Sequence, residues 1–280
     1  MILVFGKNGQ VGTELQKFSE NICLDKNDCD ITKISEVKDI LNEYKPKGVI
    51  NAAAYTEVDN SEKNIELAKS VNSIAPGGIA KVCKNLNIPL IHISTDYVFD
   101  GTTEDQMYEE DETSPLSIYG KTKAQGELNV FKNGSQVIIL RTSWVFSSTG
   151  NNFVKTILKL SKEMNTIRVV SDQIGSPTSA ISIAETCMKI IKMMKKDSNL
   201  SGIFHYSGYP YTSWANFARC ILQLKKIDTK IEDIGTNEYL TLAKRPLNSI
   251  LNCDKVYNDL GIKRPNWKKD LIEVVNTLIK

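Results

Sequence analysis

Three residues in the first half of the chain have side chains suited to proton transfer at a carbonyl group. Tyr119 and Lys123 are four residues apart, a spacing that places both side chains on one face of a helix. Thr95 follows an apolar run at residues 88–93 that is typical of a buried strand. A phenol can donate a proton, and a nearby ammonium favours the anionic form of a phenol. We therefore predict that Tyr119 is a general acid whose pKa is lowered by Lys123, and that Thr95 holds the reacting oxygen.

Because a Tyr-x-x-x-Lys spacing also occurs by chance in many helices, these residues need a scaffold that brings them together. The chain begins with a short apolar strand at residues 2–5, which is followed by Gly6, Gly9 and Gly12 and by a predicted helix at residues 10–18. Glycines between a strand and a helix let the pyrophosphate of a dinucleotide approach the backbone. An ordinary glycine turn is the alternative interpretation.

The second predicted strand, at residues 22–24, ends at Asp25. This position is about 20 residues after the first glycine, where a dinucleotide-binding fold carries the carboxylate that binds the ribose. Lys26 could meet a 2′-phosphate or be a solvated loop charge, so the choice between NADH and NADPH stays open. We expect Asp30 to accept a hydrogen bond from the adenine amine, and Thr32 to be the N-cap of the next helix.

The third predicted strand, at residues 47–51, leads into three alanines whose small side chains let the cofactor approach: Ala52, Ala53 and Ala54. Residues 61–86 read as helical with a break near Asn72, and a second helix is predicted to begin just before Pro76. The acidic run at residues 109–112 predicts a solvated loop with no chemistry.

A further buried strand at residues 136–141 precedes Trp144. Ligands bind at the carboxyl ends of parallel strands, so Trp144 is either a wall of a sugar site or a core aromatic residue. Strands and helices alternate to about residue 170, which predicts an α/β fold with a Rossmann-type, doubly wound parallel sheet at residues 1–170. A turn-rich segment then opens a smaller α/β substrate-binding part at residues 171–280, which we expect to be interleaved with the first.

The composition indicates an ordinary globular protein of 280 residues, 41% hydrophobic and 24% charged. A net charge of +2 gives no reason to expect nucleic acid or a membrane as partner. The six cysteines are scattered and form no C-x-x-C pair, and the chain starts with a strand and not with a signal peptide, so we expect reduced thiols and a cytoplasmic location. Of the two histidines, His92 is predicted to be a satisfied core residue, and no metal site is predicted.

Several blocks of the sequence resemble the extended short-chain dehydrogenase/reductase superfamily and, more closely, the dTDP-4-dehydrorhamnose reductase family. They are Gly-Lys-Asn-Gly-Gln-Val-Gly at residues 6–12, Ser-Thr-Asp-Tyr-Val-Phe at residues 94–99, Asp-Gln-x-Gly-x-Pro-Thr at residues 172–178 and Arg-Pro-x-Asn-Ser at residues 245–249. The resemblance covers nearly the whole chain. It implies that NADPH or NADH reduces the 4-keto group of dTDP-4-dehydro-L-rhamnose to give dTDP-L-rhamnose.

The resemblance also implies the roles of individual residues. Tyr119 would protonate the developing alkoxide, Lys123 would bind the nicotinamide ribose, and Thr95 would hydrogen-bond the keto oxygen. The cofactor would be bound by Gly6, Asn8, Gly9, Gln10, Val11, Gly12, Asp25, Asp30, Ile31, Ala52, Ala53, Ala54, Tyr119 and Lys123. The dTDP-sugar would be bound by Val58, Asp96, Trp144, Asn151, Asn152 and Arg245.

One departure from the family pattern concerns assembly. Some members dimerise around a metal ion held by glutamates. Glu14 matches one of these positions, but Ile181 and Thr277 stand at the other two and are poor ligands, so we expect a monomer or a metal-free homodimer.

Two other functions remain open. The first is a nucleotide-sugar epimerase or dehydratase of the same superfamily. Dehydratases carry an acidic pair after the strand-end threonine, whereas here Asp96 is followed by Tyr97. The second is a non-catalytic regulatory subunit on this scaffold, such as the partner of a methionine adenosyltransferase. The complete set of Thr95, Tyr119 and Lys123 argues against that alternative.

Overall fold

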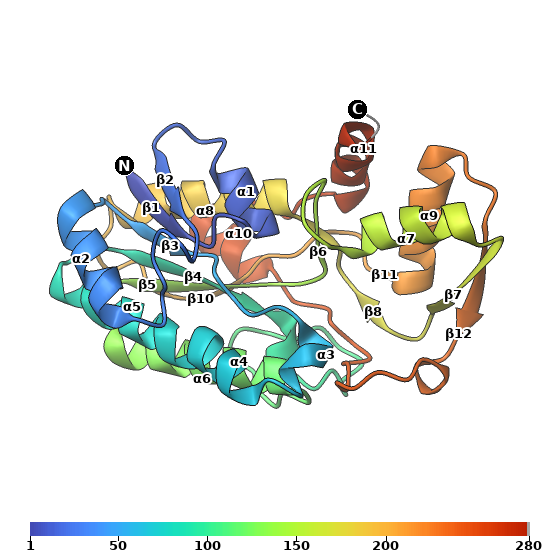
Figure 1. The fold of residues 1–280 in the computed structure, drawn as a ribbon, viewed down its shortest axis with the longest axis horizontal. Coiled ribbons are helices and arrows are strands. Elements are labelled where there is room, and N and C mark those ends of the chain that lie inside the picture. Colours follow the sequence, from blue (N-terminus) through green and yellow to red (C-terminus); the bar gives the residue numbers. More distant parts are fainter. Residues whose placement is uncertain (279–280) are drawn as a thin grey trace.

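The computed structural model describes residues 1–278, and its central feature is a six-stranded parallel sheet with the order β10-β5-β4-β3-β1-β2 (Figure 1). The strands are β1 Ile2–Phe5, β2 Asn21–Leu24, β3 Val49–Asn51, β4 Leu90–Thr95, β5 Val137–Thr142 and β10 Gly202–His205. The strand order reverses between β1 and β3, and a ligand binds at the carboxyl ends of strands flanking such a reversal. The predicted doubly wound sheet is confirmed.

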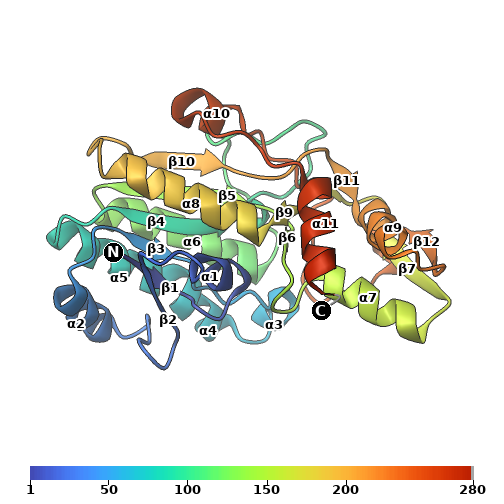
Figure 2. The same ribbon diagram turned by 90° about the horizontal axis from the view of Figure 1, so that it is seen from above.

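Helices cover both faces of the sheet, and Figure 2 shows α8 lying along one of them. On that face pack α1 Gln10–Leu15, α8 Ala180–Met194 and α10 Asp254–Leu260, and on the other α2 Ile34–Tyr44, α5 Ala75–Asn85 and α6 Ile118–Asn133. Strand side chains alternate between the two cores, as the period of two requires. Val4 and Ile91 belong to the first core, Leu3 and Leu90 to the second.

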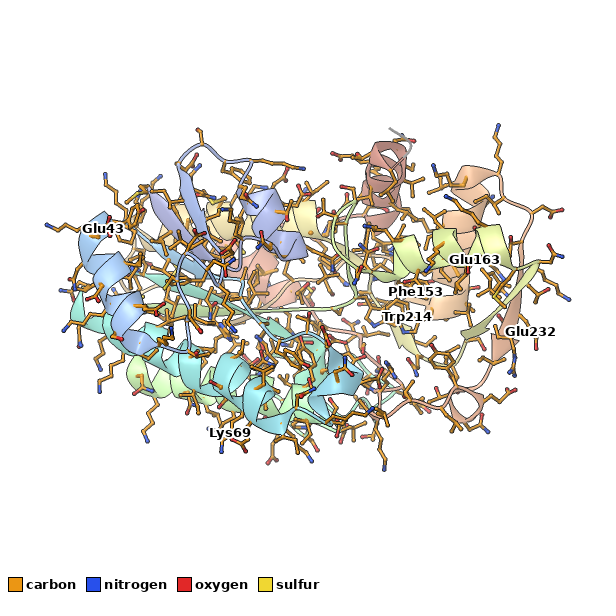
Figure 3. All side chains as sticks on the ribbon, viewed as in Figure 1. Glu43, Lys69, Phe153, Glu163, Trp214 and Glu232 are labelled. Atoms are coloured by element: carbon orange, nitrogen blue, oxygen red, sulfur yellow. The ribbon has the colours of Figure 1, made fainter. Side chains whose placement is uncertain are left out.

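A third hydrophobic core lies beside the sheet, in the part of the molecule at the right of Figure 1. It is built mainly from α7 Phe153–Glu163, β7 Thr166–Val170, α9 Trp214–Lys225, β12 Lys230–Ile234 and α11 Trp267–Thr277. Two short pairs connect it with the sheet part: β6 Val145–Phe146 with β9 Thr178–Ser179, and β8 Ile174–Gly175 with β11 Thr212–Ser213. Phe153 of α7 and Trp214 of α9 pack against each other there (Figure 3), with ring centroids 4.6 Å apart.

The helical segment before α5 is interrupted as predicted. It consists of α3 Val58–Ser61, α4 Ile65–Lys69 and a π-helical stretch, Ser70–Ile74. Asn72 lies in this stretch, and its side chain accepts from the backbone N–H of Tyr55 at 2.8 Å and donates to the carbonyl of Tyr55 at 3.0 Å. The π-bulge thus aims an amide at the loop after β3. The next helix starts at Ala75, just before Pro76, which confirms that prediction.

Two local predictions are wrong. Thr32 is not a helix N-cap, because α2 begins at Ile34 after Lys33, and the Thr32 hydroxyl donates to Asp30 Oδ1 at 2.7 Å. The acidic run is not wholly solvated either. Glu109 is 6% exposed, and its Oε1 accepts from the backbone N–H of His205 at 2.8 Å, which satisfies an amide at the end of β10. Within residues 1–278, no helix is long and apolar enough to cross a membrane.

Candidate active site

The end of β4 and the first turn of α6 bring the predicted catalytic residues together. Ser117 caps α6, since its hydroxyl accepts from the backbone N–H of Gly120 at 3.1 Å. A Cβ at position 120 would overlap the carbonyl of Tyr97, so the glycine allows the 3-10 turn Asp96–Val98 to pack against the start of the helix. The rings of Tyr97 and Tyr119 meet edge to face, with centroids 5.6 Å apart. This packing sets the Tyr119 phenol beside the Thr95 hydroxyl.

Burial raises the pKa of Tyr119 to about 12, and the hydrogen bond between the Tyr119 and Thr95 side chains acts in the opposite direction. The prediction that Lys123 lowers this pKa is therefore wrong. The Nζ of Lys123 donates to the carbonyl of Ile93 at 2.6 Å. A phenol with a high pKa holds its proton at neutral pH, which suits a group that protonates an alkoxide.

Lys123 is 2% exposed, and burial lowers its pKa to about 8, while the charge of Glu127 one turn further along α6 acts in the opposite direction. His92 lies beneath it on β4 and is fully buried. Its Nε2 is 3.4 Å from the Nζ of Lys123 and its Nδ1 is 3.1 Å from the Nδ2 of Asn51. The prediction of a satisfied core histidine is confirmed.

The glycine turn after β1 leaves room for a cofactor next to the backbone. Gly6 has a φ of +95°, which favours glycine, and a Cβ there would lie 2.6 Å from the backbone nitrogen of Ala53. A Cβ at Gly12 would overlap the carbonyl of Gly6. At Gly9 it would meet only that carbonyl, at 3.3 Å, and would otherwise project into open space. Together with the half-buried Ala52 and Ala54, these residues form a cradle that fits the pyrophosphate and ribose of a dinucleotide.

The side chains within the glycine turn have other partners. Val11 is buried in the core that the sheet forms with α8 and α10. The Oε1 of Gln10 accepts from Ser147 Oγ at 3.0 Å and from Asn152 Nδ2 at 3.1 Å. The Gln10 side chain therefore connects the turn with the segment that leads into α7, and only its backbone is free to face a phosphate.

Asp25 stands at the end of β2 as an ionised carboxylate. Its Oδ1 accepts from the backbone N–H of Asn27 at 2.8 Å, the main cause of its lowered pKa, and its Oδ2 accepts from Asn8 Nδ2 at 3.1 Å. Lys26 is exposed. Asp30 is half-buried and holds the turn of Thr32, while Ile31 beside it is buried. Asn8 and Asp25 are thus in contact, as a shared ribose site requires.

The residues predicted to bind the sugar lie on several separate segments. Asp96 is 2% exposed, it accepts from Thr95 Oγ1 at 3.0 Å, and burial raises its pKa to about 6. Val58 begins α3, and its neighbour Asp59 pairs with Arg245 through Oδ2 and Nη2 at 2.7 Å. Asp59 also accepts from the backbone N–H of Ala243 at 3.0 Å, so α3 is connected with the 243–245 segment.

Trp144 is half-buried with a φ of +48°, and its ring stacks on Trp214 with centroids 3.5 Å apart and an interplanar angle of 8°. Asn151 is exposed, whereas Asn152 is the N-cap of α7 and accepts from the backbone N–H of Lys155 at 3.2 Å. The sequence reasoning missed Trp214 and Asp59. No sequence signal indicated them, because each reaches the site only through a partner far away in the chain.

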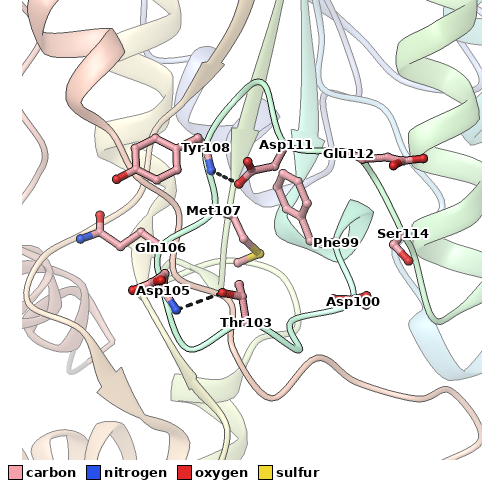
Figure 4. A pocket seen from close by; sticks show the side chains of 10 residues that line it. All are labelled: Phe99, Asp100, Thr103, Asp105, Gln106, Met107, Tyr108, Asp111, Glu112 and Ser114. Atoms are coloured by element: carbon pink, nitrogen blue, oxygen red, sulfur yellow. Dashed lines mark hydrogen bonds between the residues drawn. The ribbon is translucent and has the colours of Figure 1, made fainter.

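A cavity of about 390 Å³ lies apart from the predicted catalytic residues (Figure 4). Ten residues between Phe99 and Ser114 line it, and Thr95, Tyr119 and Lys123 do not. Among residues 1–278, no group of three or more His, Cys, Asp or Glu side chains could hold a metal ion. Glu14 is 3% exposed and pairs with Lys17 at 2.5 Å.

A parallel sheet with a glycine turn after β1 and a buried Tyr119–Lys123 pair beside the end of β4 defines a nucleotide-dependent oxidoreductase of the short-chain dehydrogenase/reductase class. The family model described as the RmlD substrate binding domain matches residues 1–279. A dTDP-4-dehydrorhamnose reductase of Sinorhizobium fredii is 39% identical, over 99% of this chain and 97% of its own length. The chain belongs to the dTDP-4-dehydrorhamnose reductase family.

Solved structures agree with this assignment. A dTDP-4-dehydrorhamnose reductase of Clostridium acetobutylicum is 38% identical with a TM-score of 0.94, over 100% of this chain and 99% of that one. The enzyme of Bacillus anthracis, solved in complex with NADP, is 34% identical with a TM-score of 0.93, over 99% of this chain and 98% of that one.

Proposed function

We propose that this protein is the reductase that converts dTDP-4-dehydro-L-rhamnose to dTDP-L-rhamnose with NADPH or NADH, the last step of dTDP-rhamnose biosynthesis. The observation that carries the proposal is the buried Thr95–Tyr119–Lys123 arrangement in a chain of the dTDP-4-dehydrorhamnose reductase family. When bound, the nicotinamide supplies the hydride.

The protein's own residues supply the proton and the charge stabilisation. Thr95 and Tyr119 present two hydroxyls to one point at the end of β4, where negative charge develops on the former keto oxygen. Tyr119 holds its proton until the alkoxide forms and then donates it. The Lys123 ammonium is placed to bind the nicotinamide ribose. Asp25 with Asn8 would hold the adenosine ribose, and Trp144 and Arg245 would contact the dTDP-sugar.

Cofactor absorbance tests the function directly. The full chain is mixed with enzymatically generated dTDP-4-dehydro-L-rhamnose, and the loss of NADPH or NADH is followed in separate reactions. Substrate-dependent loss with dTDP-L-rhamnose as the product would support the proposal. Cofactor binding without any loss would favour an isomerase, another keto sugar or a regulatory subunit.

Tyr119→Phe tests the assigned mechanism. We expect kcat to fall about 10²- to 10⁴-fold, the range in which a general acid contributes, while cofactor binding measured by fluorescence titration stays nearly unchanged. Tyr206→Phe is the matched control, since it removes another buried phenol hydroxyl, which bonds Thr186. Equal turnover of Tyr119→Phe and the unmodified protein would contradict the mechanism.

We further propose a cytoplasmic enzyme that is a monomer or a metal-free homodimer, with residues 171–280 supplying most of the sugar site. The assembly proposal rests on Ile181 and Thr277, which stand where metal-bridged relatives need carboxylates. Light scattering with and without EDTA tests it, and a dimer that EDTA dissociates would overturn it.

A further inference from the structure

The imidazole of His92 lies behind Lys123 and connects it with the small residues after β3. Its Nε2 is 3.4 Å from the Nζ of Lys123, and its Nδ1 is 3.1 Å from the Nδ2 of Asn51. None of these three residues is more than 2% exposed. Because water does not compete inside the protein, the direction of each hydrogen bond is set by the partner groups.

The backbone of Ala53 determines these directions. Its N–H donates to the Oδ1 of Asn51 at 3.2 Å, so the Asn51 amide turns its Nδ2 toward His92. An amide nitrogen only donates, and a neutral imidazole carries its proton on the nitrogen that does not accept. His92 is neutral, because burial lowers its pKa well below the usual value. Its proton is therefore on Nε2 and points at the Nζ of Lys123.

A donor pointing at Nζ suits the lone pair of an amine and disfavours an ammonium. We propose that His92 is a positioning residue that stabilises the amine form of Lys123 and thereby sets the pH above which Lys123 loses the positive charge proposed to bind the nicotinamide ribose. The inference rests on the proposed function for its catalytic consequence. The tautomer itself follows from the contacts of Asn51 and the burial of His92, and it does not depend on the reaction.

The other groups around Lys123 are few. On α6, Tyr119 lies one turn before it and Glu127 one turn after it. Glu127 favours the ammonium, but its carboxylate is already paired with Arg141 of β5 at 2.7 Å. Strand β4 contributes His92 and, just beyond its end, the buried Asp96, and β3 contributes the uncharged Asn51. His92 is thus the polar side chain in contact with Nζ, which also donates to the carbonyl of residue 93 at 2.6 Å.

Nitrogen NMR of the full chain labelled with ¹⁵N-histidine tests the tautomer without any assay of activity. The protein has two histidines, and the second is an internal reference. The Nδ1 of His205 lies 3.2 Å from the carbonyl of Asn252 and must donate to it, while Arg141 Nη1 faces its Nε2 at 3.3 Å. We expect one Nε2–H and one Nδ1–H imidazole, assigned with His92→Gln. Two Nδ1–H imidazoles would overturn the proposal.

The pH profile of kcat tests the consequence. In Asn51→Asp, one carboxylate oxygen can still accept from the backbone N–H of Ala53, and the other can accept from Nδ1–H of His92. The proton of His92 then moves to Nδ1, and the lone pair of its Nε2 faces the Lys123 ammonium. We expect the alkaline limb of kcat to move upward by about one pH unit, the size of shift that one charged or hydrogen-bonded neighbour produces. His92→Gln, whose amide oxygen can accept from Nζ, should move it in the same direction.

A merely structural role would reduce kcat equally at every pH. Ile91→Val is the matched control, because it alters a fully buried side chain on the same strand that makes no hydrogen bond. Unshifted limbs in both Asn51→Asp and His92→Gln would overturn the proposal. If the unmodified protein reduces no 4-keto sugar, the proposed function fails, and the NMR result still decides the tautomer.

Discussion

Two arginine–carboxylate pairs have the same contact distance but differ in how far their side chains are exposed to solvent. Arg141 and Glu127 join β5 to α6 at 2.7 Å with side chains 2% and 4% exposed. Arg245 and Asp59 join the 243–245 segment to α3, also at 2.7 Å, with side chains 22% and 38% exposed. The first pair lies within the sheet part that carries the catalytic helix, and the second at the predicted sugar site.

The comparison shows that burial, and not the contact distance, decides how much an ion pair matters for stability. A pair that is partly exposed to solvent is screened by water and contributes ~0–1 kcal/mol to stability. A buried pair has lost the hydration of both charges, so removing one partner leaves an uncompensated charge. Arg141 is further held by His205 and by the ring of Phe99, 5.0 Å from the guanidinium carbon. The buried pair maintains the fold, whereas the more exposed pair holds Arg245 beside α3.

The largest expected effect comes from Glu127→Gln. It leaves the Arg141 guanidinium buried without a counter-charge, so we expect the free energy of unfolding to fall by about 3–5 kcal/mol. Urea unfolding measures this. Glu232→Gln is the control, since it breaks a pair with Arg168 in which both side chains are about half exposed. If the free energy of unfolding fell equally in the two variants, burial would not explain the difference between buried and exposed pairs.

A buried carboxylate without a cation partner sharpens the comparison. The pKa of Asp96 is raised to about 6 by burial, above its ordinary value of 3.8. The folded state therefore binds the proton more tightly than the unfolded state, and stability falls as pH rises from the lower to the higher value. The side chain introduced by Asp96→Asn does not titrate. We therefore expect the unfolding free energy of the variant, minus that of the unmodified protein, to be roughly 1–3 kcal/mol larger near pH 7 than at pH 4.

Urea unfolding of Asp96→Asn and of the unmodified protein at the two pH values measures that gain. Asp39→Asn, which changes an exposed carboxylate on α2, is the control. A difference between Asp96→Asn and the unmodified protein that does not change with pH would contradict the prediction. Turnover of Asp96→Asn should fall at the same time, because the carboxylate lies beside Thr95.

The smallest effect on stability is expected for Asp59→Asn, below about 1 kcal/mol. The change removes the charge that holds Arg245, so the KM for the dTDP-sugar should rise about three- to tenfold, which corresponds to at most ~1.4 kcal/mol. Steady-state kinetics at low and high salt measures it, since salt screens exposed charges. A loss of stability as large as that of Glu127→Gln would refute the assigned difference between the pairs.

Local patterns in the sequence predicted the sheet part well. Tyr119 and Lys123 are one helical turn apart, and glycines at positions 6, 9 and 12 restrict the turn after β1, so short-range geometry alone constrained both features. The errors at Thr32 and Glu109 arose where a distant or neighbouring group competed for a side chain: Asp30 for the threonine hydroxyl and His205 for the carboxylate.

The sequence by itself determined the class of fold, the family and the residues able to transfer a proton, because these depend on residue type and spacing along one element. Only the tertiary structure decided which neighbouring groups determine the charge of Tyr119 and Lys123. Burial raised the pKa of Tyr119, and it lowered the pKa of Lys123, whose Nζ donates to the carbonyl of Ile93. Desolvation and hydrogen-bond direction depend on atoms from several strands and helices, and no local pattern encodes them.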